Sequence, residues 1–414
     1  MGDTKQPPVK IALVCPDGLS ILLFCKGIIR TLQTVPGARV YVLCDAGRYA
    51  AEIRALDVSC VSIPVYRWIS PWEDLKYTLR LWRAMRSHRF DIVLNFSTKP
   101  NICGTFAARF SGVKLNLMHI VGLGSAFQPR QGVQGRVVRR MFIAAYRLAC
   151  RLSDRVWFTN SRDRQFFIDN HLVSADATVL SRNYLDTREY ALSSVDDRRR
   201  EEARVLCKLR PDEKMVIMVA RLIWQKGVRE FAEAAELLHE SRPELKFVLV
   251  APEETGSPDV VPRSFVLEKE KSSNFKWLGF QDDVKRLYAV ADLAVLPTYY
   301  KEGGFPRGLL EPMSMGKPVI TTTSEDCRGA VEEGKNGFLV PIRDSRALAE
   351  AITRIMSNDS LRRAFGNYSR VKAVRDFDEL SILPETLRKM AVNVPVLGPE
   401  REDVPIDIAA VRSS

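Results

Sequence analysis

Two glutamates flank a loop that is rich in glycine. Glu302 and Glu311 lie nine residues apart in Pro297–Gly316, PTYYKEGGFPRGLLEPMSMG. The apolar run before this stretch predicts a buried strand of a parallel sheet. Glycines such as Gly304 let a ligand approach the backbone, and Pro306 suits the first turn of a helix, whose N-terminus favours an anion. The stretch predicts either an anion site between two carboxylates or an ordinary strand-to-helix connection with two surface glutamates.

Arg221 and Lys226 form a second group of residues that could bind a charged ligand. Both follow the apolar strand expected at Met215–Ala220 and precede the helix expected at Val228–His239. A guanidinium can bridge two phosphate oxygens, and a lysine adds a point charge beside them. At the carboxyl end of a strand this pair suits a phosphate-bearing ligand. Taken alone, two cations on a surface loop would indicate nothing.

Together, the two segments resemble the fingerprint of the retaining family 4 glycosyltransferases, which have the GT-B fold. EGGFPRGLLEP (302–312) is similar to their donor-sugar signature Glu-x7-Glu, written EG-x-PR-x-LLEA in close relatives. RLIWQKG (221–227) is similar to their GRL-x-x-x-KG segment. The resemblance implies an α/β protein with two facing, Rossmann-like, doubly wound domains. A nucleotide-sugar would bind in the cleft between them, without a metal or other cofactor.

The resemblance also implies a role for each matching residue. Arg221 and Lys226 would neutralise the departing diphosphate. Glu311 would accept hydrogen bonds from the ribose hydroxyls. Glu302 would be the catalytic carboxylate beside the donor sugar, as a nucleophile or in a front-face displacement where the leaving phosphate helps to deprotonate the acceptor. Backbone contacts to the donor would come from Gly304, Phe305 and Pro306.

This sequence departs from the family pattern at several positions. The two glutamates are nine residues apart, whereas the family spacing is eight. Either Gly303–Gly304 carries an insertion, or the first acid lies elsewhere. Pro312 replaces the usual alanine and predicts a kink in the helix. Ala220 replaces the first glycine of the GRL segment.

The first half of the chain alternates apolar strands with helical patterns, which predicts a doubly wound domain. Gly18 lies in the loop after the first strand, and TKPNICGTFAAR (98–109) resembles the TKPN-x-x-GT pattern of the same family. HIVGLGSAF (119–127) resembles their ITGLGYVF segment, in which a histidine just before the first glycine contacts the donor sugar. Val121 has that position here. His119, two residues earlier, is therefore either a catalytic candidate or a packed histidine at a strand end.

Positive charge is concentrated in the first half. The chain has a net charge of +12, and residues 1–190 hold 27 lysines and arginines against 14 acidic residues, a net +13. In the helix expected at Trp72–Arg89, Leu75, Leu79, Trp82 and Met85 share a face that basic residues flank, and Arg136–Arg155 carries further arginines. These helices are either ordinary exterior helices or a membrane surface. Candidate residues for contact with a membrane or acceptor are Trp72, Lys76, Arg80, Arg83, Arg147 and Arg151.

Composition limits the class of protein. The chain of 414 residues suits two domains, and no apolar run reaches the roughly 20 residues that a bilayer span needs. Eight cysteines without a Cys-x-x-Cys pair indicate reduced thiols in the cytoplasm. The four histidines do not have metal-ligand spacing, so we expect no metal.

The expected domain plan has five parts. Residues 1–190 form an acceptor- and membrane-facing domain, 191–212 an exposed linker, and 213–370 the nucleotide-sugar domain. Residues 371–390 form a helix that crosses back to the first domain, and 391–414 a disordered tail.

The closest sub-pattern is that of bacterial transferases that build surface glycans on polyprenyl-diphosphate carriers. It implies transfer of a hexose or N-acetylhexosamine from a UDP-sugar to a lipid-linked saccharide. The protein would be cytoplasmic and peripheral at the inner face of the cytoplasmic membrane. Two alternatives stay open: a GT-B UDP-sugar epimerase, which needs no lipid acceptor, and a non-catalytic membrane or nucleic-acid binding protein. No base-reading segment is visible, so we expect no nucleic-acid partner.

Overall fold

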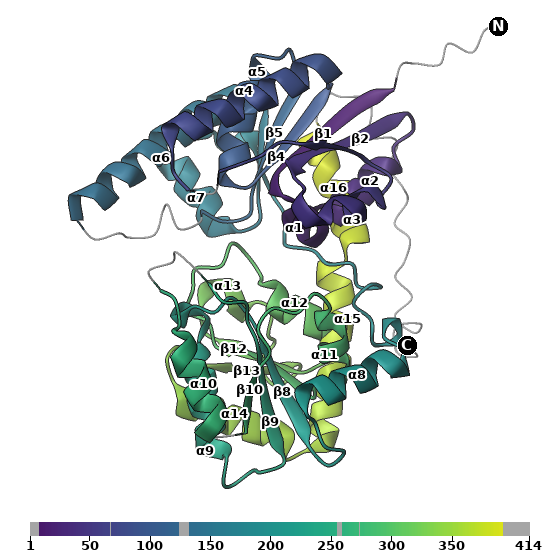
Figure 1. Cartoon of the computed structure of the whole chain (residues 1–414), viewed down its shortest axis with the longest axis vertical. Coiled ribbons are helices and arrows are strands. Elements are labelled where there is room, and N and C mark those ends of the chain that lie inside the picture. The colour runs from purple at the N-terminus through teal and green to yellow at the C-terminus, as the bar shows by residue number, and fades with distance from the viewer. Residues whose placement is uncertain (1–7, 67, 124–131, 255–258, 273, 392–414) are drawn as a thin grey trace, which may run out of the picture. The chain divides into compact units, whose positions relative to one another are not determined.

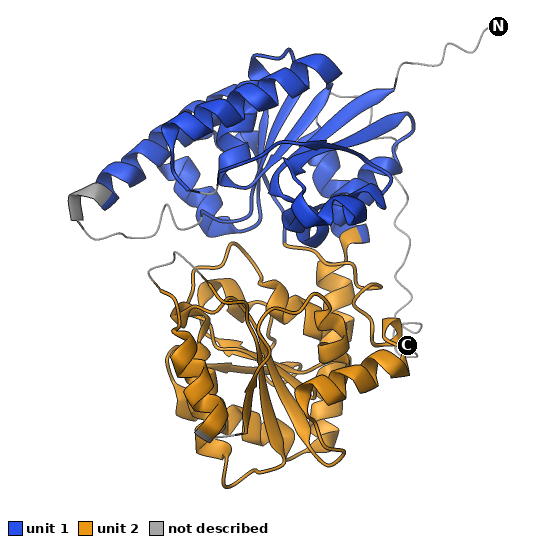
Figure 2. Cartoon of the chain, viewed as in Figure 1, with its two compact units in different colours: residues 1–182, 380–403 blue, residues 183–379, 404–414 orange. Residues whose placement is uncertain are grey.

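The computed structural model describes residues 8–66, 68–123, 132–254, 259–272 and 274–391. The chain divides into two compact units (Figure 2). Unit 1 comprises residues 1–182 and 380–403, and unit 2 comprises residues 183–379 and 404–414. The division falls at residue 182, whereas the sequence analysis placed the end of the first domain at residue 190. The expected tail, 391–414, lies outside the described residues after Ala391.

Unit 1 is built on a parallel sheet of seven strands in the order β3-β2-β1-β4-β5-β6-β7 (Figure 1). The order reverses between β1 and β4, which pair directly. In sheets of this kind, ligands bind outside the carboxyl ends of the strands at such a switch point. The strands are β1 (Val9–Asp17), β2 (Ala38–Asp45), β3 (Ser59–Ser62), β4 (Ile92–Phe96), β5 (Leu115–Ile120), β6 (Arg155–Phe158) and β7 (Thr178–Leu180).

The helices of unit 1 cover this sheet with two apolar clusters. Tyr77, Leu81 and Met85 of α4 are buried with residues of β1, β2, β4 and α5, and Tyr146 of α6 is buried with residues of β5, β6 and α7. The helices are α1 (Gly18–Ser20), α2 (Lys26–Gln33), α3 (Ala50–Arg54), α4 (Pro71–His88), α5 (Thr105–Arg109), α6 (Gly132–Leu152), α7 (Ser161–Asp169) and α16 (Glu379–Met390). Two π-helical turns, η1 (Ile21–Cys25) and η3 (Pro100–Gly104), follow the loops after β1 and β4.

The last helix, α16, follows unit 2 in the sequence, but from Leu380 onward it belongs to unit 1. Thr386 Oγ1 donates a hydrogen bond to Ser181 Oγ at 2.7 Å. The helix continues through Pro384 without interruption. Its first turn starts at Glu379, because extended backbone at Asp378 separates it from α15 (Asp359–Phe377).

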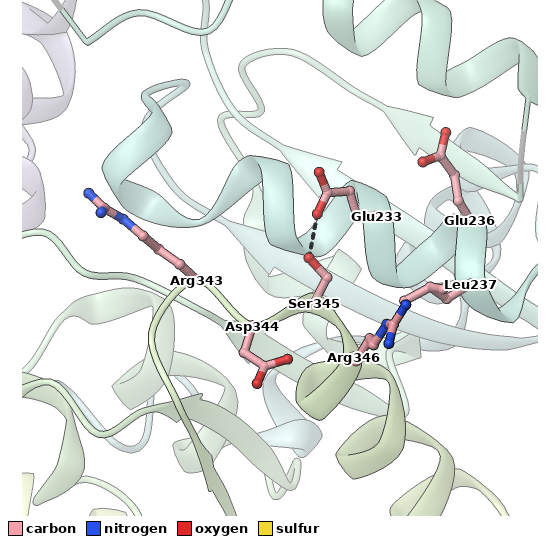
Figure 3. A pocket seen from close by; sticks show the side chains of 7 residues that line it. All are labelled: Glu233, Glu236, Leu237, Arg343, Asp344, Ser345 and Arg346. Carbon is pink, nitrogen blue, oxygen red and sulfur yellow. Dashed lines mark hydrogen bonds between the residues drawn. The ribbon is translucent and has the colours of Figure 1, made fainter.

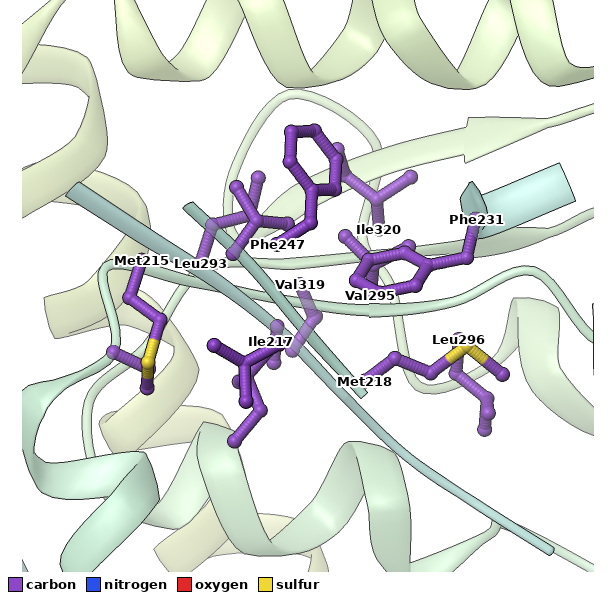
Figure 4. Close-up of a cluster of buried hydrophobic side chains, with 14 of the residues drawn as sticks. Met215, Ile217, Met218, Phe231, Phe247, Leu293, Val295, Leu296, Val319 and Ile320 are labelled. Atoms are coloured by element: carbon purple, nitrogen blue, oxygen red, sulfur yellow. The ribbon is translucent and has the colours of Figure 1, made fainter. Parts of the chain in front are cut away.

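Unit 2 contains a parallel sheet of six strands in the order β10-β9-β8-β11-β12-β13. Figure 4 shows part of its core, in which Met215, Ile217, Phe247, Leu293 and Val319 pack from neighbouring strands. The strands are β8 (Lys214–Val219), β9 (Leu245–Val250), β10 (Phe275–Trp277), β11 (Leu293–Leu296), β12 (Val319–Thr322) and β13 (Gly337–Val340). The remaining helices are α8 (Asp197–Cys207), α9 (Val228–Leu238), α10 (Arg263–Ser272), α11 (Val284–Val290), α12 (Arg307–Ser314), α13 (Glu325–Arg328) and α14 (Ser345–Met356).

The segment expected as an exposed linker, 191–212, differs from that expectation. Its helix α8 buries Ala203 and Cys207 in the core of unit 2. Arg199 on the same helix donates to Asp283 at 2.6 Å. The segment has so many charged residues that its sequence indicated exposure. Two small side chains, one helical turn apart, attach it to the domain.

Candidate functional site

The candidate donor site lies where the strand order of unit 2 reverses. β8 and β11 pair directly there, and the loops that leave their carboxyl ends carry Arg221, Lys226 and Glu302. The backbone N–H groups of Tyr299 and Tyr300 both donate to the Gln225 carbonyl, at 2.9 and 3.0 Å. The two loops are therefore joined into one surface, and charged residues far apart in the sequence lie together.

Two glycines make this close approach possible. Gly227 has a φ of +83°, and a Cβ there would lie 2.2 Å from the Pro297 carbonyl oxygen. A Cβ on Gly308, at the start of α12, would lie 2.7 Å from the Val219 carbonyl oxygen. Any larger side chain at either position would push the loops and α12 apart.

Lys226 and Glu302 form an ion pair at this junction. Lys226 Nζ lies 2.5 Å from Glu302 Oε1, and Thr298 Oγ1 donates to the same oxygen at 3.1 Å. Both residues are almost completely buried, with 8% and 7% of their surface exposed. Such a pair contributes little net stability, because burial removes both charges from water. Glu302 thus lies beside the predicted phosphate-binding lysine despite the nine-residue spacing. Gly304 in the same loop has a φ of +113°.

One aromatic ring contacts both of the predicted phosphate-binding cations. The Arg221 guanidinium and the Lys226 ammonium lie 5.0 and 5.1 Å from the centre of the Tyr300 ring. Cation–π attraction holds both charges at one place. Tyr300 was not predicted, although it stands two residues before Glu302 in the same stretch.

Glu311 is buried on α12 in a separate network. Its Oε1 accepts a hydrogen bond from Arg307 Nε at 2.7 Å, and Arg307 Nη2 donates to Tyr190 Oη at 3.1 Å. Burial raises the pKa of the Glu311 carboxyl, and the charge of Arg307 opposes that shift. Glu311 is therefore held by protein groups in this structure. Arg307 and Tyr190 were not predicted, although Arg307 is the arginine of the EG-x-PR motif.

The residues between the two glutamates serve partly to build the loop. The Phe305 carbonyl accepts a hydrogen bond from Asn183 Nδ2 at 2.9 Å, and its ring packs edge-to-face on Phe377. Pro306 is the N-cap of α12, one residue before the helical turn that the sequence analysis assigned to it. The kink expected at Pro312 does not interrupt α12, which runs unbroken from Arg307 to Ser314.

His119 is packed inside unit 1. Its ring stacks on the Trp157 indole with the centres 3.6 Å apart, and only 1% of the residue is exposed. Burial lowers the pKa of its imidazole to about 3, so the ring is neutral at physiological pH. Among the described residues, neither ring nitrogen has a hydrogen-bond partner. This geometry matches the packed alternative, and a catalytic role for His119 stays a prediction. Residues 124–131 of the segment that follows lie outside the described part.

Gly18 starts α1 at the carboxyl end of β1. A Cβ there would lie 2.7 Å from the Ala46 carbonyl oxygen, so glycine lets this loop pack against the chain after β2. Asp17 caps the turn by accepting a hydrogen bond from Ser20 N at 2.8 Å. Gly18 is buried, and this packing requirement is enough to explain glycine at the position.

The exposed surface of α4 differs from the expectation. Met85 faces the core with Tyr77 and Leu81, whereas Leu75 and Leu79 are exposed. The helix therefore has a buried apolar face and a second, exposed one. We call the exposed set the aromatic patch: Tyr66, Trp68, Ile69, Trp72, Leu75 and Leu79.

Of the expected basic contacts, Arg80 and Arg83 on α4 are exposed, and Lys76 is half-buried in an ion pair with Glu73 at 2.7 Å. On α6, Arg151 is exposed, and Arg147 donates to the Asn170 carbonyl at 3.2 Å. In the part of the chain that the structure describes, no helix is long and apolar enough to cross a bilayer.

A hollow of about 460 Å³ lies elsewhere in unit 2 (Figure 3). It opens beside α9 and the first turn of α14, where Ser345 Oγ donates to Glu233 at 2.5 Å. None of the candidate donor-site residues lines it. Among the described residues, no cluster of three or more His, Cys, Asp or Glu side chains could hold a metal ion.

Comparisons with known proteins cover most of the chain. Residues 199–372 match the family model of group 1 glycosyl transferases, and residues 28–183 match the glycosyl transferase 4-like domain. A Campylobacter jejuni N,N'-diacetylbacillosaminyl-diphospho-undecaprenol alpha-1,3-N-acetylgalactosaminyltransferase is 27% identical over 86% of this chain and 91% of its own length. An Escherichia coli UDP-Gal:alpha-D-GlcNAc-diphosphoundecaprenol alpha-1,3-galactosyltransferase is 25% identical over 75% of this chain and 78% of its own length.

Solved structures share the fold. Anabaena HepE, whose crystal structure contains UDP and glucose, superimposes with a TM-score of 0.74 at 18% identity, over 93% of this chain and 100% of its own. A Rickettsia africae glycosyltransferase superimposes with a TM-score of 0.75 at 16% identity, over 94% of this chain and 100% of its own. The predicted fold class is confirmed, and the predicted cleft between the domains stays a prediction. The chain belongs to the family 4 glycosyltransferases of the GT-B fold and is a hexosyltransferase.

Proposed function

We propose that this enzyme transfers a hexose or N-acetylhexosamine from a UDP-sugar to a polyprenyl-diphosphate-linked saccharide, with retention of configuration. The observation that carries the donor half is the junction of Arg221, Lys226 and Glu302 at the switch point of unit 2. The acceptor half is supported by the names of the relatives, which act on diphospho-undecaprenol-linked sugars.

The donor site would act by neutralising the leaving group without a metal. Arg221 can bridge two phosphate oxygens, and Lys226 supplies a second charge already fixed by Glu302 and Thr298. Fixed charges of this kind need no reorganisation when the UDP leaves. Glu311 would bind the ribose hydroxyls, with Arg307 keeping its carboxylate in position.

Glu302 would orient the donor sugar. One of its oxygens already accepts hydrogen bonds from two donors, Lys226 and Thr298, which stabilise the carboxylate and reduce its strength as a nucleophile. This arrangement supports the front-face displacement over a covalent intermediate. The leaving phosphate, bound by Arg221 and Lys226, would then take the proton of the acceptor hydroxyl.

Unit 1 would lie on the inner face of the cytoplasmic membrane. The aromatic patch, which lies on α4 and on the segment before it, is exposed, and Lys76, Arg80 and Arg83 are basic residues of the same helix. Apolar side chains with a basic border suit the interface of an anionic bilayer. The excess of positive charge in residues 1–190 supports the same contact.

Release of UDP tests this function. The purified protein is mixed with a panel of UDP- and GDP-sugars, with and without polyprenyl-diphosphate-linked saccharides. We expect UDP release that requires the lipid-linked saccharide and disappears in Glu302→Gln but not in Lys335→Met, a surface variant of unit 2. Conversion of the sugar nucleotide without any acceptor would instead identify an epimerase. Absence of UDP release in every mixture would contradict the proposed transfer from a UDP-sugar to a lipid-linked saccharide.

A further inference from the structure

Lys99 lies at the switch point of unit 1, in the short connection from β4 to η3, where it has helical backbone angles. The carboxyl ends of β1 and β4 meet there, so this is the expected ligand-binding edge of the sheet. The loop has a fixed shape. Asn101 Nδ2 donates to the His119 carbonyl at 2.9 Å, and His119 N donates back to Asn101 Oδ1 at 3.2 Å. These two hydrogen bonds attach the loop to β5.

Ser97, two residues before Lys99, has a φ of +78°. For a residue other than glycine this conformation is strained, and such strain is found mainly where the surroundings hold a binding site in shape. The Ser97 carbonyl also accepts a hydrogen bond from Asn101 N at 2.8 Å. The loop therefore presents Lys99 from a backbone whose geometry is set by its neighbours.

The Lys99 ammonium is held in place by unit 1 itself. Its Nζ lies 2.5 Å from Asp74 Oδ1 and donates to the Trp68 carbonyl at 2.7 Å. It also lies 5.9 Å from the centre of the Tyr66 ring. An ammonium has three donors, and these two acceptors engage two of them. With 19% of its side chain exposed, Lys99 keeps one donor for an additional acceptor from outside.

The segment that Lys99 contacts carries the aromatic patch. Tyr66 and Trp68 belong to the patch and also contact the ammonium, and Trp72 lies two residues before Asp74. Lys99 therefore contacts two residues of the exposed aromatic patch and belongs to the same connection as Ser97. A polyprenyl-diphosphate-linked saccharide joins a hydrocarbon chain, two phosphates and a sugar.

We propose that Lys99 binds the diphosphate of the lipid-linked acceptor. The polyprenyl chain then lies toward the aromatic patch, and the saccharide lies at the switch point beside Ser97. Asp74 fixes the ammonium before the acceptor arrives, so that little side-chain freedom is lost on binding. The inference rests on the proposed function, because it assumes a lipid-linked acceptor.

The test compares two acceptors that differ by one phosphate. Initial rates are measured at saturating donor for a polyprenyl-diphosphate saccharide and for the same saccharide on polyprenyl monophosphate. The variants are Lys99→Met and Asp74→Asn. The matched control is Lys114→Met, because Lys114 also pairs with an aspartate, Asp91 at 2.8 Å, but has 77% of its side chain exposed.

We expect Lys99→Met to lower kcat/KM for the diphosphate acceptor by about 10- to 100-fold, mainly through KM, since it removes a charged hydrogen bond. The monophosphate acceptor should change much less. Asp74→Asn keeps the ammonium and should keep the preference for diphosphate. Lys114→Met should behave as the wild type. Equal losses on both acceptors in Lys99→Met and Asp74→Asn would overturn the proposal and leave a structural ion pair.

A binding measurement separates this inference from the proposed function. Farnesyl diphosphate and farnesyl monophosphate are titrated by calorimetry with excess UDP present to occupy the donor site. If no acceptor is turned over, the transferase proposal fails. Lys99 still stands as a diphosphate site if the wild type binds farnesyl diphosphate at least 10-fold more tightly than Lys99→Met does. Equal binding by the two proteins contradicts it.

Discussion

Unit 1 and unit 2 are both parallel sheets whose strand order reverses once, between β1 and β4 in one and between β8 and β11 in the other. They differ in how their charged residues are paired. At the switch point of unit 2, Lys226 pairs with Glu302, and on α12 Arg307 pairs with Glu311. Residues 1–190, which hold most of unit 1, have a net charge of +13 and cannot pair all their cations internally.

This difference separates two kinds of binding. A site with buried, fixed charges suits a small charged ligand that must be held precisely, such as a nucleotide diphosphate. A surface with excess charge and exposed apolar side chains suits an extended anionic interface. This difference supports the proposal that the donor binds to unit 2 and the lipid-linked acceptor to unit 1.

The largest effect is expected from Lys226→Met in unit 2. Loss of one fixed charge beside the leaving group should reduce kcat by about 10²- to 10³-fold. The substitution also leaves Glu302 buried without its partner, which should lower the melting temperature. Lys226→Met/Glu302→Gln removes both charges, and we expect it to recover much of the melting temperature and none of the activity. Recovery of activity in the double variant would show that the pair is only structural.

Gly227→Ala should have the next largest effect, on stability. A Cβ at this position meets the Pro297 carbonyl at 2.2 Å and requires a positive φ. We expect a loss of about 3 kcal/mol or more in the free energy of unfolding. Gly334→Ala is the matched control, because Gly334 has a φ of +72° and no atom within 4 Å of the added Cβ. It should lose only about 1–2 kcal/mol. Equal melting temperatures for the two variants would mean that the loop contact is unimportant.

Trp72→Ser tests the surface of unit 1. Removing an interfacial aromatic side chain should weaken binding to anionic phospholipid vesicles by about 10-fold, equivalent to about 1.4 kcal/mol. Val205→Ser is the control from unit 2, because Val205 is 69% exposed and Trp72 is 66% exposed. Flotation of vesicles with each protein gives the bound fraction. A similar loss in both variants would remove the distinction between the units.

The smallest effect concerns a charge cluster that holds α15 to unit 2. Tyr368 Oη and Lys372 Nζ donate to Glu332 at 2.6 and 3.0 Å, and these hydrogen bonds lower the pKa of the Glu332 carboxyl to about 2. A carboxyl whose folded pKa is below its ordinary value stabilises the fold above that ordinary value. This stabilisation is lost as the pH falls toward 2.

Glu332→Gln should therefore lower stability at pH 7 by at most about 1 kcal/mol, because 30% of the Glu332 side chain is exposed and solvent screens its charge. The difference from the wild type should shrink between pH 4.5 and pH 2. Melting temperatures at several pH values provide the test. A difference that grows as the pH falls would have the wrong sign for this explanation.

The sequence predicted the fold class, because apolar periodicity is a local signal. It also placed the candidate donor-site residues at the ends of strands, and their role in binding the donor stays a prediction. Apolar runs mark buried parallel strands, and the motifs at Arg221–Gly227 and Glu302–Pro312 stand at their carboxyl ends. The sequence also predicted one helix over residues 371–390 that crosses back to the first domain. The structure divides this stretch at Asp378 into the end of α15 and the helix α16, which from Leu380 is grouped with unit 1. The role of that helix between the units stays a prediction.

Other features depend on contacts between distant segments and could not be read from spacing. Lys99 contacts Asp74, 25 residues away, and Lys226 contacts Glu302, 76 residues away. The predicted apolar face of α4 was wrong in part, because both apolar stripes of the helix fit a helical period. Only packing on β1 and β4 decides which stripe is buried. The packed ring of His119 depends on Trp157 in the neighbouring strand in the same way.

The assignment of the donor to unit 2 is tested most directly by the affinity for UDP. Calorimetry is performed on the wild type, Lys226→Met and Lys99→Met, each with a melting curve to verify folding. We predict that Lys226→Met weakens UDP binding at least about 10-fold, as expected for a charged hydrogen bond to phosphate, and that Lys99→Met leaves it unchanged. Loss of UDP binding in Lys99→Met with normal binding in Lys226→Met would contradict the account.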